Sequence, residues 1–164
     1  MQKLDQLLPN VKEYICNSTD RVTNLPCRSL PERMKINPGK TGNLETELRL
    51  KVGAPVFITT NHANKKYKED GIINGARGFV QFIQTSKENP DMVEVVWIVF
   101  HKENIGRRYR FDHNHLRKHC NPGHELATPI LPQRKTFKEK FGDAEYQRTN
   151  FPISLAYAMS RRYT

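Results

Sequence analysis

The feature that most limits the possible folds is an apolar run at residues 92–100, with the sequence M-V-E-V-V-W-I-V-F. Glu94 is its only charged residue, and most of the others are β-branched or aromatic, which favours a strand. The sequence N-P-D at 89–91 predicts a turn before the run, and E-N-I-G at 103–106 predicts a hairpin turn after it. The chain is therefore expected to be built mainly from β-strands.

Several shorter strands are predicted around this run. They are expected at 48–52, 54–60, 77–84 and 107–112, with a returning strand at 151–155. In the fourth of these, Tyr109 and Phe111 alternate with charged residues, which indicates a strand with one wet face. Pro122, Pro129 and Pro132 predict an extended crossing before the chain returns. Short antiparallel strands with one long crossover predict a small barrel.

Regular structure outside this part is expected only in short pieces. Residues 1–8 predict the end of a helix, closed by Pro9. Residues 9–47 are rich in proline, glycine and asparagine, so we expect them to be irregular, with a short helical turn at 29–35. Residues 156–162 predict the start of a final helix.

Glycines indicate where the backbone turns tightly. Asn74 and Gly75 form a turn signal because both residues tolerate positive φ, and Gly53 lies at the start of a strand. Gly75 and Gly78 flank Arg77, so a backbone can pass close to a ligand while a cation points at it.

Three segments make the sequence resemble a known family. These are L-K-V-G-A-P-V-F-I-T-T-N at 50–61, G-I-I-N-G-A-R-G-F-V at 71–80 and F-P-I-S-L-A-Y-A-M at 151–159. They resemble the PIF-type and RecD-like superfamily 1 DNA helicases, and they occur in the family's order. The resemblance implies an SH3-like antiparallel barrel, flanked by pieces of the RecA-like α/β second motor domain.

The resemblance also implies a division of the chain and a set of functional residues. Residues 1–47 would be an irregular remnant of the motor domain, 48–135 the inserted barrel, and 136–164 the return strand with a truncated fifth helicase motif. It assigns a role in backbone geometry to Gly53, Asn74, Gly75 and Gly78. It assigns polar contacts with nucleic acid to Asn61, Arg77 and Ser160. It places Pro55, Leu155 and Ala156 at the ends of the barrel.

The motifs of an ATP-driven motor are not expected in this chain. The one candidate phosphate loop is P-G-K-T at 38–41, but Met34 stands where the loop G-x-x-x-x-G-K-[ST] needs its first glycine. After Met159 the fifth motif continues as S-R-R-Y-T rather than in the family's pattern. We therefore expect a helicase fragment that does not hydrolyse ATP alone and binds no cofactor, with ATP and magnesium implied for the intact parent enzyme.

The net charge of +10 favours nucleic acid as a partner. Lysine and arginine number 27 against 17 acidic residues, and many of them cluster beside tyrosines. Cations neutralise phosphates while aromatic rings stack with bases, which suits single-stranded DNA. The residues predicted to bind it, besides the three named above, are Lys65, Lys66, Arg107, Arg108, Tyr109 and Arg110. The alternatives are a solvated basic surface without a ligand, or a stand-alone adaptor that binds RNA or a protein partner.

A histidine cluster offers a rival chemistry. His113, His115, His119, Cys120 and His124 supply enough nitrogen and sulfur for zinc, but the usual paired ligand spacing is only half present. We therefore expect no metal site and a fold that withstands a chelator.

The cysteines and the expected lack of a leader predict the cellular compartment of the protein. The three cysteines show no C-x-x-C spacing, which favours free thiols, and the sequence has neither a secretory leader nor a long apolar run. An intracellular protein, nuclear or cytoplasmic, is expected, acting with the remainder of a helicase motor.

Overall fold

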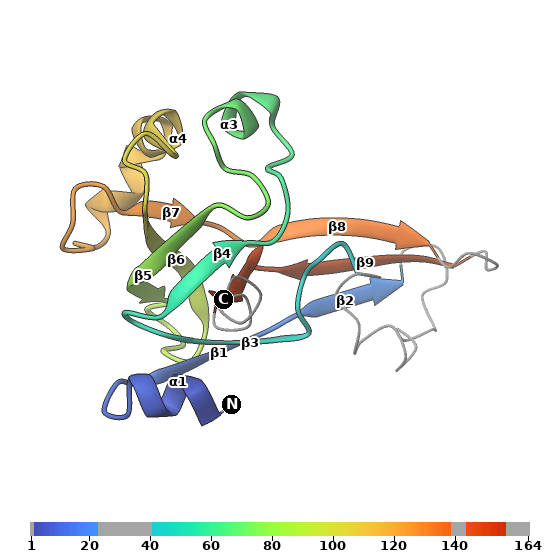
Figure 1. Ribbon diagram of the computed structural model, residues 1–164. Coiled ribbons are helices and arrows are strands. Elements are labelled where there is room, and N and C mark those ends of the chain that lie inside the picture. Colours follow the sequence, from blue (N-terminus) through green and yellow to red (C-terminus); the bar gives the residue numbers. More distant parts are fainter. Residues whose placement is uncertain (1, 23–40, 139–143, 157–164) are drawn as a thin grey trace, which may run out of the picture.

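The computed structural model describes residues 2–22, 41–138 and 144–156, and these form a mainly β protein (Figure 1). The described residues are mainly β, with 41% strand and 16% helix, which confirms the predicted class. The strands are β1 Glu13–Asn17, β2 Thr19–Val22, β3 Glu47–Lys51, β4 Pro55–Ile58, β5 Arg77–Thr85, β6 Val93–Phe100, β7 Thr128–Ile130, β8 Gln133–Lys138, β9 Glu145–Asn150 and β10 Ile153–Leu155. The helices are α1 Gln2–Leu7, α3 Lys65–Glu69, α4 Arg107–Asp112 and the 3-10 helix η2 Asn114–Lys118.

A five-stranded sheet in the order β10-β4-β5-β6-β7 forms the centre. Strand β6 is buried on both faces, which explains why its sequence is a continuous apolar run rather than an alternating one. Val96, Ile98 and Phe100 join a core with residues of α1, β1 and β3, whereas Val95 and Trp97 pack on the other face. Each such side chain contributes about 1.5–3 kcal/mol when fully buried.

The β5–β6 hairpin requires a glycine at residue 78. A Cβ atom there would lie 2.4 Å from the carbonyl oxygen of Val99, so no larger residue fits beside β6. Gly78 therefore lies within β5 rather than in a turn, and it is the close approach to β6 that requires a residue without a side chain. The turn predicted at 89–91 is confirmed, since the chain reverses direction between Thr85 and Val93. The hairpin predicted at 103–106 is wrong, because helix α4 follows it and β6 pairs instead with β7.

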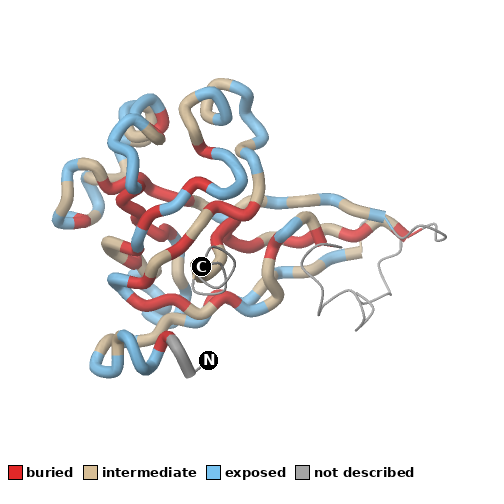
Figure 2. The backbone as a smooth tube through the Cα atoms, in the orientation of Figure 1, coloured by how far each residue is buried: buried red, intermediate tan, exposed pale blue. Residues whose placement is uncertain are grey.

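Strands β8, β9 and β2 form a second sheet that extends away from the central one (Figure 1). Strand β9 alternates between half-buried and buried residues, and its buried positions are Tyr146, Arg148 and Asn150. Figure 2 shows the buried residues concentrated in the central sheet, with buried and half-buried residues alternating along β9. The small third sheet pairs β1 with β3.

Three expectations need correction. Every strand pair in the described ranges is antiparallel, as predicted, but the sheets are open and do not close into a barrel. Residues 9–47 are not irregular throughout, because β1 and β2 lie there and pair with later strands. Residues 107–112 form helix α4 instead of a strand.

The predicted short helix at the start is confirmed as α1, and the returning strand as β10. The helical turn expected at 29–35 lies outside the described residues, as does the final helix beyond residue 156. Residues from all three expected divisions meet in one core, including Leu4, Leu48 and Phe151. The division of the chain at 47/48 and 135/136 stays a prediction.

No helix in the described ranges is long and apolar enough to cross a membrane. Cys16 and Cys120 carry free thiols, and burial raises the pKa of Cys16 to about 11.

Candidate nucleic-acid interface

Two short helices lie side by side at one end of the central sheet, and we call residues 65–70 and 107–112 the basic helix pair (Figure 1). Their sequences, K-K-Y-K-E-D and R-R-Y-R-F-D, have the same order of charges around a tyrosine except at the fifth position, where Glu69 corresponds to Phe111. Together they carry six cations against three carboxylates. The pair therefore concentrates positive charge on a small part of the surface.

Each segment of the basic helix pair ends in an aspartate that holds the other segment. The carboxylate of Asp70 accepts hydrogen bonds from the backbone N–H groups of Arg108 (3.2 Å) and Tyr109 (3.0 Å), which caps α4. Asp112 accepts one from the Tyr67 hydroxyl (3.0 Å) and forms an ion pair with Lys66. This reciprocal arrangement fixes the two helices to each other.

The cap explains why residues 107–112 are helical. Gly106, at the start of α4, has φ +73° and no side chain, so it supplies no cap of its own. Its N–H donates to the carbonyl oxygen of Asp70 at 2.9 Å, which brings the Asp70 carboxylate to the helix start. The alternating pattern of residues 107–112 predicts a strand, but the segment forms a helix because a carboxylate from a distant part of the chain caps it.

Four rings pack together where the two helices meet, the two tyrosines of the basic helix pair and two histidines near it in the chain. Tyr109 stacks on His113 with ring centroids 3.9 Å apart and meets Tyr67 edge-on at 4.8 Å, while His62 lies against both tyrosines. Tyr109 is only 4% exposed, and burial raises its pKa to about 12. The ring predicted to stack with a base is therefore a packing residue here.

The predicted cations fall into two groups. Lys65, Arg107 and Arg108 are exposed, and Lys65 and Arg108 border one shallow hollow of the surface. Arg110 instead donates to the carbonyl oxygens of Glu103 and Ile105 and to the Thr128 hydroxyl, at 2.7–3.0 Å. Arg110 is consequently a brace for the loop before α4.

Lys66 is half-exposed and paired with Asp112. The hydrogen bond from Lys66 is the main reason why the pKa of Asp112 is lowered. Lys66 therefore helps to hold the two helices together, although its side chain is still partly exposed at the surface.

A cleft separates the basic helix pair from β7 and β8. The four packed rings line one side, and Gln133, Arg134 and Lys135 line the other. Burial, with the nearby charges of His113 and Lys135, lowers the pKa of His62. The cleft thus joins a basic strand to the aromatic interior of the helix pair.

Comparison with known proteins identifies the fold. No family model matches the sequence, and no curated protein matches it. Among solved structures, the chain is similar to the Pif1 helicase from Candida albicans, with 18% identity and a TM-score of 0.52 over 93% of this chain and 31% of that chain. This chain has the fold of that part of the Pif1 helicase.

Two further Pif1 structures match with TM-scores below 0.5. One is unliganded Pif1 from Bacteroides sp, with 15% identity and a TM-score of 0.44 over 92% of this chain and 34% of that chain. The other concerns DNA unwinding at forked dsDNA by two coordinating Pif1 helicases, with 17% identity and a TM-score of 0.42 over 94% of this chain and 25% of that chain. Our chain spans about a third of these proteins or less.

The residues taken from the Pif1-like motifs mostly shape turns. Gly53 and Gly75 both have φ +90°, as expected of turn glycines. The side-chain oxygen of Asn61 accepts a hydrogen bond from the N–H of Asn74 at 2.9 Å, which fixes the turn between α3 and β5. Arg77 is exposed at the start of β5.

The remaining Pif1-like positions lie at the ends of the central sheet or beyond. Pro55 is the first residue of β4, where its missing N–H does not interrupt the sheet. Leu155 ends β10, and Ala156 follows it directly. Ser160 lies outside the described residues, so its predicted contact stays a prediction.

The histidine cluster and the P-G-K-T sequence were the two other candidate sites in the sequence. His113 and His115 have ring centroids 6.2 Å apart, and no group of three or more metal-ligating side chains forms among the described residues. Of the P-G-K-T sequence only Thr41 is described, and its buried hydroxyl donates to the carbonyl oxygen of Leu44.

Two features of this Pif1-like fold were not predicted from the sequence. Phe111 is exposed on α4 beside the two exposed arginines, although it was expected to share a face with Tyr109. The similarity of K-K-Y-K-E-D to R-R-Y-R-F-D is a signal that could have indicated this. When the two sequences are aligned, Tyr109 matches Tyr67, and Phe111 takes the position of the charged residue Glu69. The other feature is a buried network around Arg148, for which no local signal exists.

Proposed function

We propose that this chain is a nucleic-acid-binding part of a Pif1-like DNA helicase, and that the basic helix pair is its contact surface for single-stranded DNA. The ATP-binding motor, with its magnesium ion, would belong to the remainder of the enzyme, which is the proposed protein partner. The observation that carries this proposal is the exposed group Lys65, Arg107 and Arg108 in a fold shared with the Pif1 helicase.

Electrostatics favours a polyanion at this surface. The carboxylates of Asp70 and Asp112 are engaged by backbone N–H groups, Tyr67 and Lys66 inside the helix pair. Glu69, the third carboxylate, forms an exposed ion pair with Lys65 at 3.6 Å. The exposed guanidinium groups of Arg107 and Arg108 therefore lie next to acids that already have partners. Cations that neutralise phosphates release bound counterions, so the resulting affinity falls steeply with salt.

The proposal is tested by titrating a fluorescent single-stranded oligonucleotide with the chain over a series of salt concentrations. We expect affinity of about micromolar or weaker that declines as salt is added. The double variant Arg107→Gln/Arg108→Gln should bind all sequences more weakly. It should also flatten the salt slope by about 1.4, because each phosphate contact to a single strand contributes about 0.7.

A matched control removes the same charge elsewhere. Arg21 is exposed on β2, and Lys87 is exposed at the far end of the β5–β6 hairpin. The variant Arg21→Gln/Lys87→Gln should keep the parent salt slope. Absence of binding at low salt, or equal weakening by both double variants, would contradict the proposal and favour an adaptor that binds another partner.

A further inference from the structure

Phe111 has an unusual environment for an aromatic residue. Its exposed fraction is 82%, the highest among the large apolar side chains in the described ranges. Burying a phenylalanine contributes about 1.5–3 kcal/mol to stability, and the fold forgoes this contribution at residue 111. A role in packing this chain therefore does not account for the ring.

The position of Phe111 on α4 places it with the exposed cations. Residues three and four apart lie on the same helix face, so Phe111 follows Arg108 and Arg107 by one turn. Tyr109 and Arg110 occupy the other side, where the first is buried and the second is tied to three oxygen atoms. One face of α4 thus presents an aromatic ring and two guanidinium groups to solvent.

The helix that carries Phe111 is held firmly. Asp70 caps its start, and Tyr109 anchors it in the ring cluster. The next residue, Asp112, is bonded to Tyr67 and Lys66. A ring on a preorganised support loses little conformational freedom when a ligand stacks on it.

We propose that Phe111 is a stacking platform for one unpaired base of a single-stranded nucleic acid, while Arg107 and Arg108 hold the neighbouring phosphates. This rests on the proposed function and adds the group that contacts the base. A nucleic acid fits better than an apolar protein surface because Phe111 is a single ring among charged residues rather than part of an apolar groove. The exposed cations beside it, Arg107 and Arg108, also complement a polyanion.

The test compares Phe111→Ala and Phe111→Trp with the parent chain in oligonucleotide titrations. Loss of one base–aromatic stack corresponds to about a 5- to 150-fold loss of affinity, and this is the expected effect of Phe111→Ala. The salt slope should stay unchanged, because a ring contacts no phosphate charge. Phe111→Trp should retain binding.

Fluorescence gives a second readout. The single native tryptophan, Trp97, is fully buried. Emission added by Phe111→Trp should therefore be quenched by an oligonucleotide with bases and not by an abasic one. Deoxyribose and ribose strands of the same sequence distinguish DNA from RNA as the source of the base.

The matched control is Met92→Ala, which removes an exposed apolar side chain at the β5–β6 turn. It should change neither affinity nor quenching, and Phe111→Ala should unfold at the parent urea concentration. Unchanged binding by Phe111→Ala, with the arginine pair still required, would overturn the stacking role alone. Absence of binding by the parent would overturn the proposed function as well, and altered self-association without altered binding would assign Phe111 to a protein contact.

Discussion

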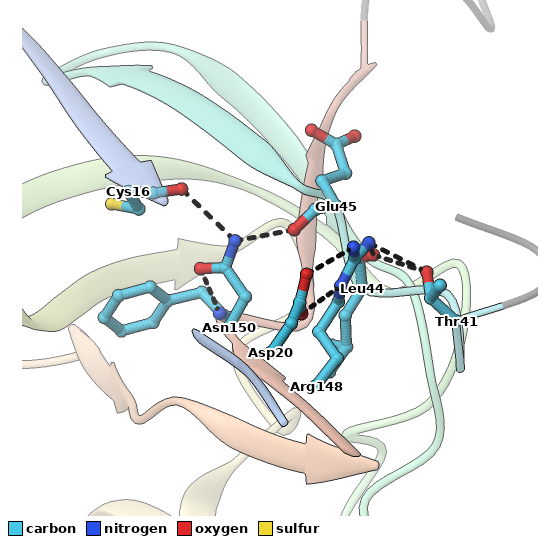
Figure 3. Close-up of polar contacts among 8 residues, drawn as sticks. Cys16, Asp20, Thr41, Leu44, Glu45, Arg148 and Asn150 are labelled. Atoms are coloured by element: carbon cyan, nitrogen blue, oxygen red, sulfur yellow. Dashed lines mark hydrogen bonds and ion pairs between the residues drawn. The ribbon is translucent and has the colours of Figure 1, made fainter. Parts of the chain in front are cut away.

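Arginines serve opposite purposes in two regions of this molecule. Arg148 of β9 is fully buried, and its guanidinium donates to both carboxylate oxygens of Asp20 at 2.7 and 2.9 Å (Figure 3). It also donates to the Thr41 hydroxyl and the Leu44 carbonyl oxygen. Arg107 and Arg108 are instead exposed on a helix.

The difference follows from desolvation. A buried cation is costly unless its donors are satisfied, so Arg148 is bound to three residues of its own chain. Asn150 is a buried polar residue nearby whose hydrogen-bonding groups are satisfied in the same way. Its amide nitrogen donates to the carbonyl oxygens of Cys16 and Glu45, and its side-chain oxygen accepts from the N–H of Phe151. The exposed guanidinium groups of Arg107 and Arg108 keep their donors for water or for a ligand, which is why the helix pair and not the β9 network is the candidate interface.

The largest expected effect comes from removing the buried cation. Arg148→Met leaves Asp20 without its partner in a largely buried site, so the free energy of unfolding should fall by about 3–5 kcal/mol. Urea unfolding measures this loss. Arg107→Met, as the exposed counterpart, should change stability by about 0.5 kcal/mol or less. Equal stability of Arg148→Met and the parent would refute the structural role of the network.

A smaller effect is expected inside the helix pair itself, where Arg110 resembles Arg148 more than its neighbours. Arg110→Met removes three hydrogen bonds to the loop at 103–105 and to Thr128. We expect a loss of about 2 kcal/mol in urea unfolding, because the site is only partly buried. If Arg107→Met were as destabilising as Arg110→Met, the division between bracing and exposed arginines would be wrong.

The smallest effect concerns pH and involves one half-buried group. The pKa of His62 is lowered, first by burial and then by the charges of His113 and Lys135. Below pH about 6.5 the unfolded chain binds this proton more readily than the folded chain. The contribution of His62 to stability is thus complete above that pH and is lost as the pH falls towards the lowered pKa of the folded chain.

Urea unfolding at pH 7.5 and 5.5 measures the His62 effect. His62→Asn should reduce the drop in stability between the two values, and Lys135→Met should reduce it less, because it removes only one contributing charge. A drop of parent size in His62→Asn would show that another group is responsible.

Local patterns were sufficient for much of the central sheet. Strand β6 was predicted because a long apolar run bounded by turn signals has few other solutions, and the turn glycines because positive φ is a property of the residue itself. The motifs around Gly53, Gly75 and Phe151 similarly indicated a Pif1-like fold. These features depend on residues close together in the chain.

Features that depend on distant residues were decided by the tertiary structure. The segment at 107–112 became a helix because Asp70, nearly forty residues earlier, caps it. Closure into a barrel was expected, but β1 and β2 pair with other strands in separate open sheets.

At the candidate site, the tertiary structure also decided that Tyr109 is buried and Phe111 is exposed. By itself the sequence determined a basic segment with two aromatic rings at 107–112. Which ring is buried depends on the helical period and on the packing of Tyr67, His62 and His113, and only the fold brings those rings together. Charge and composition are properties of the chain, whereas exposure is a property of the packed molecule.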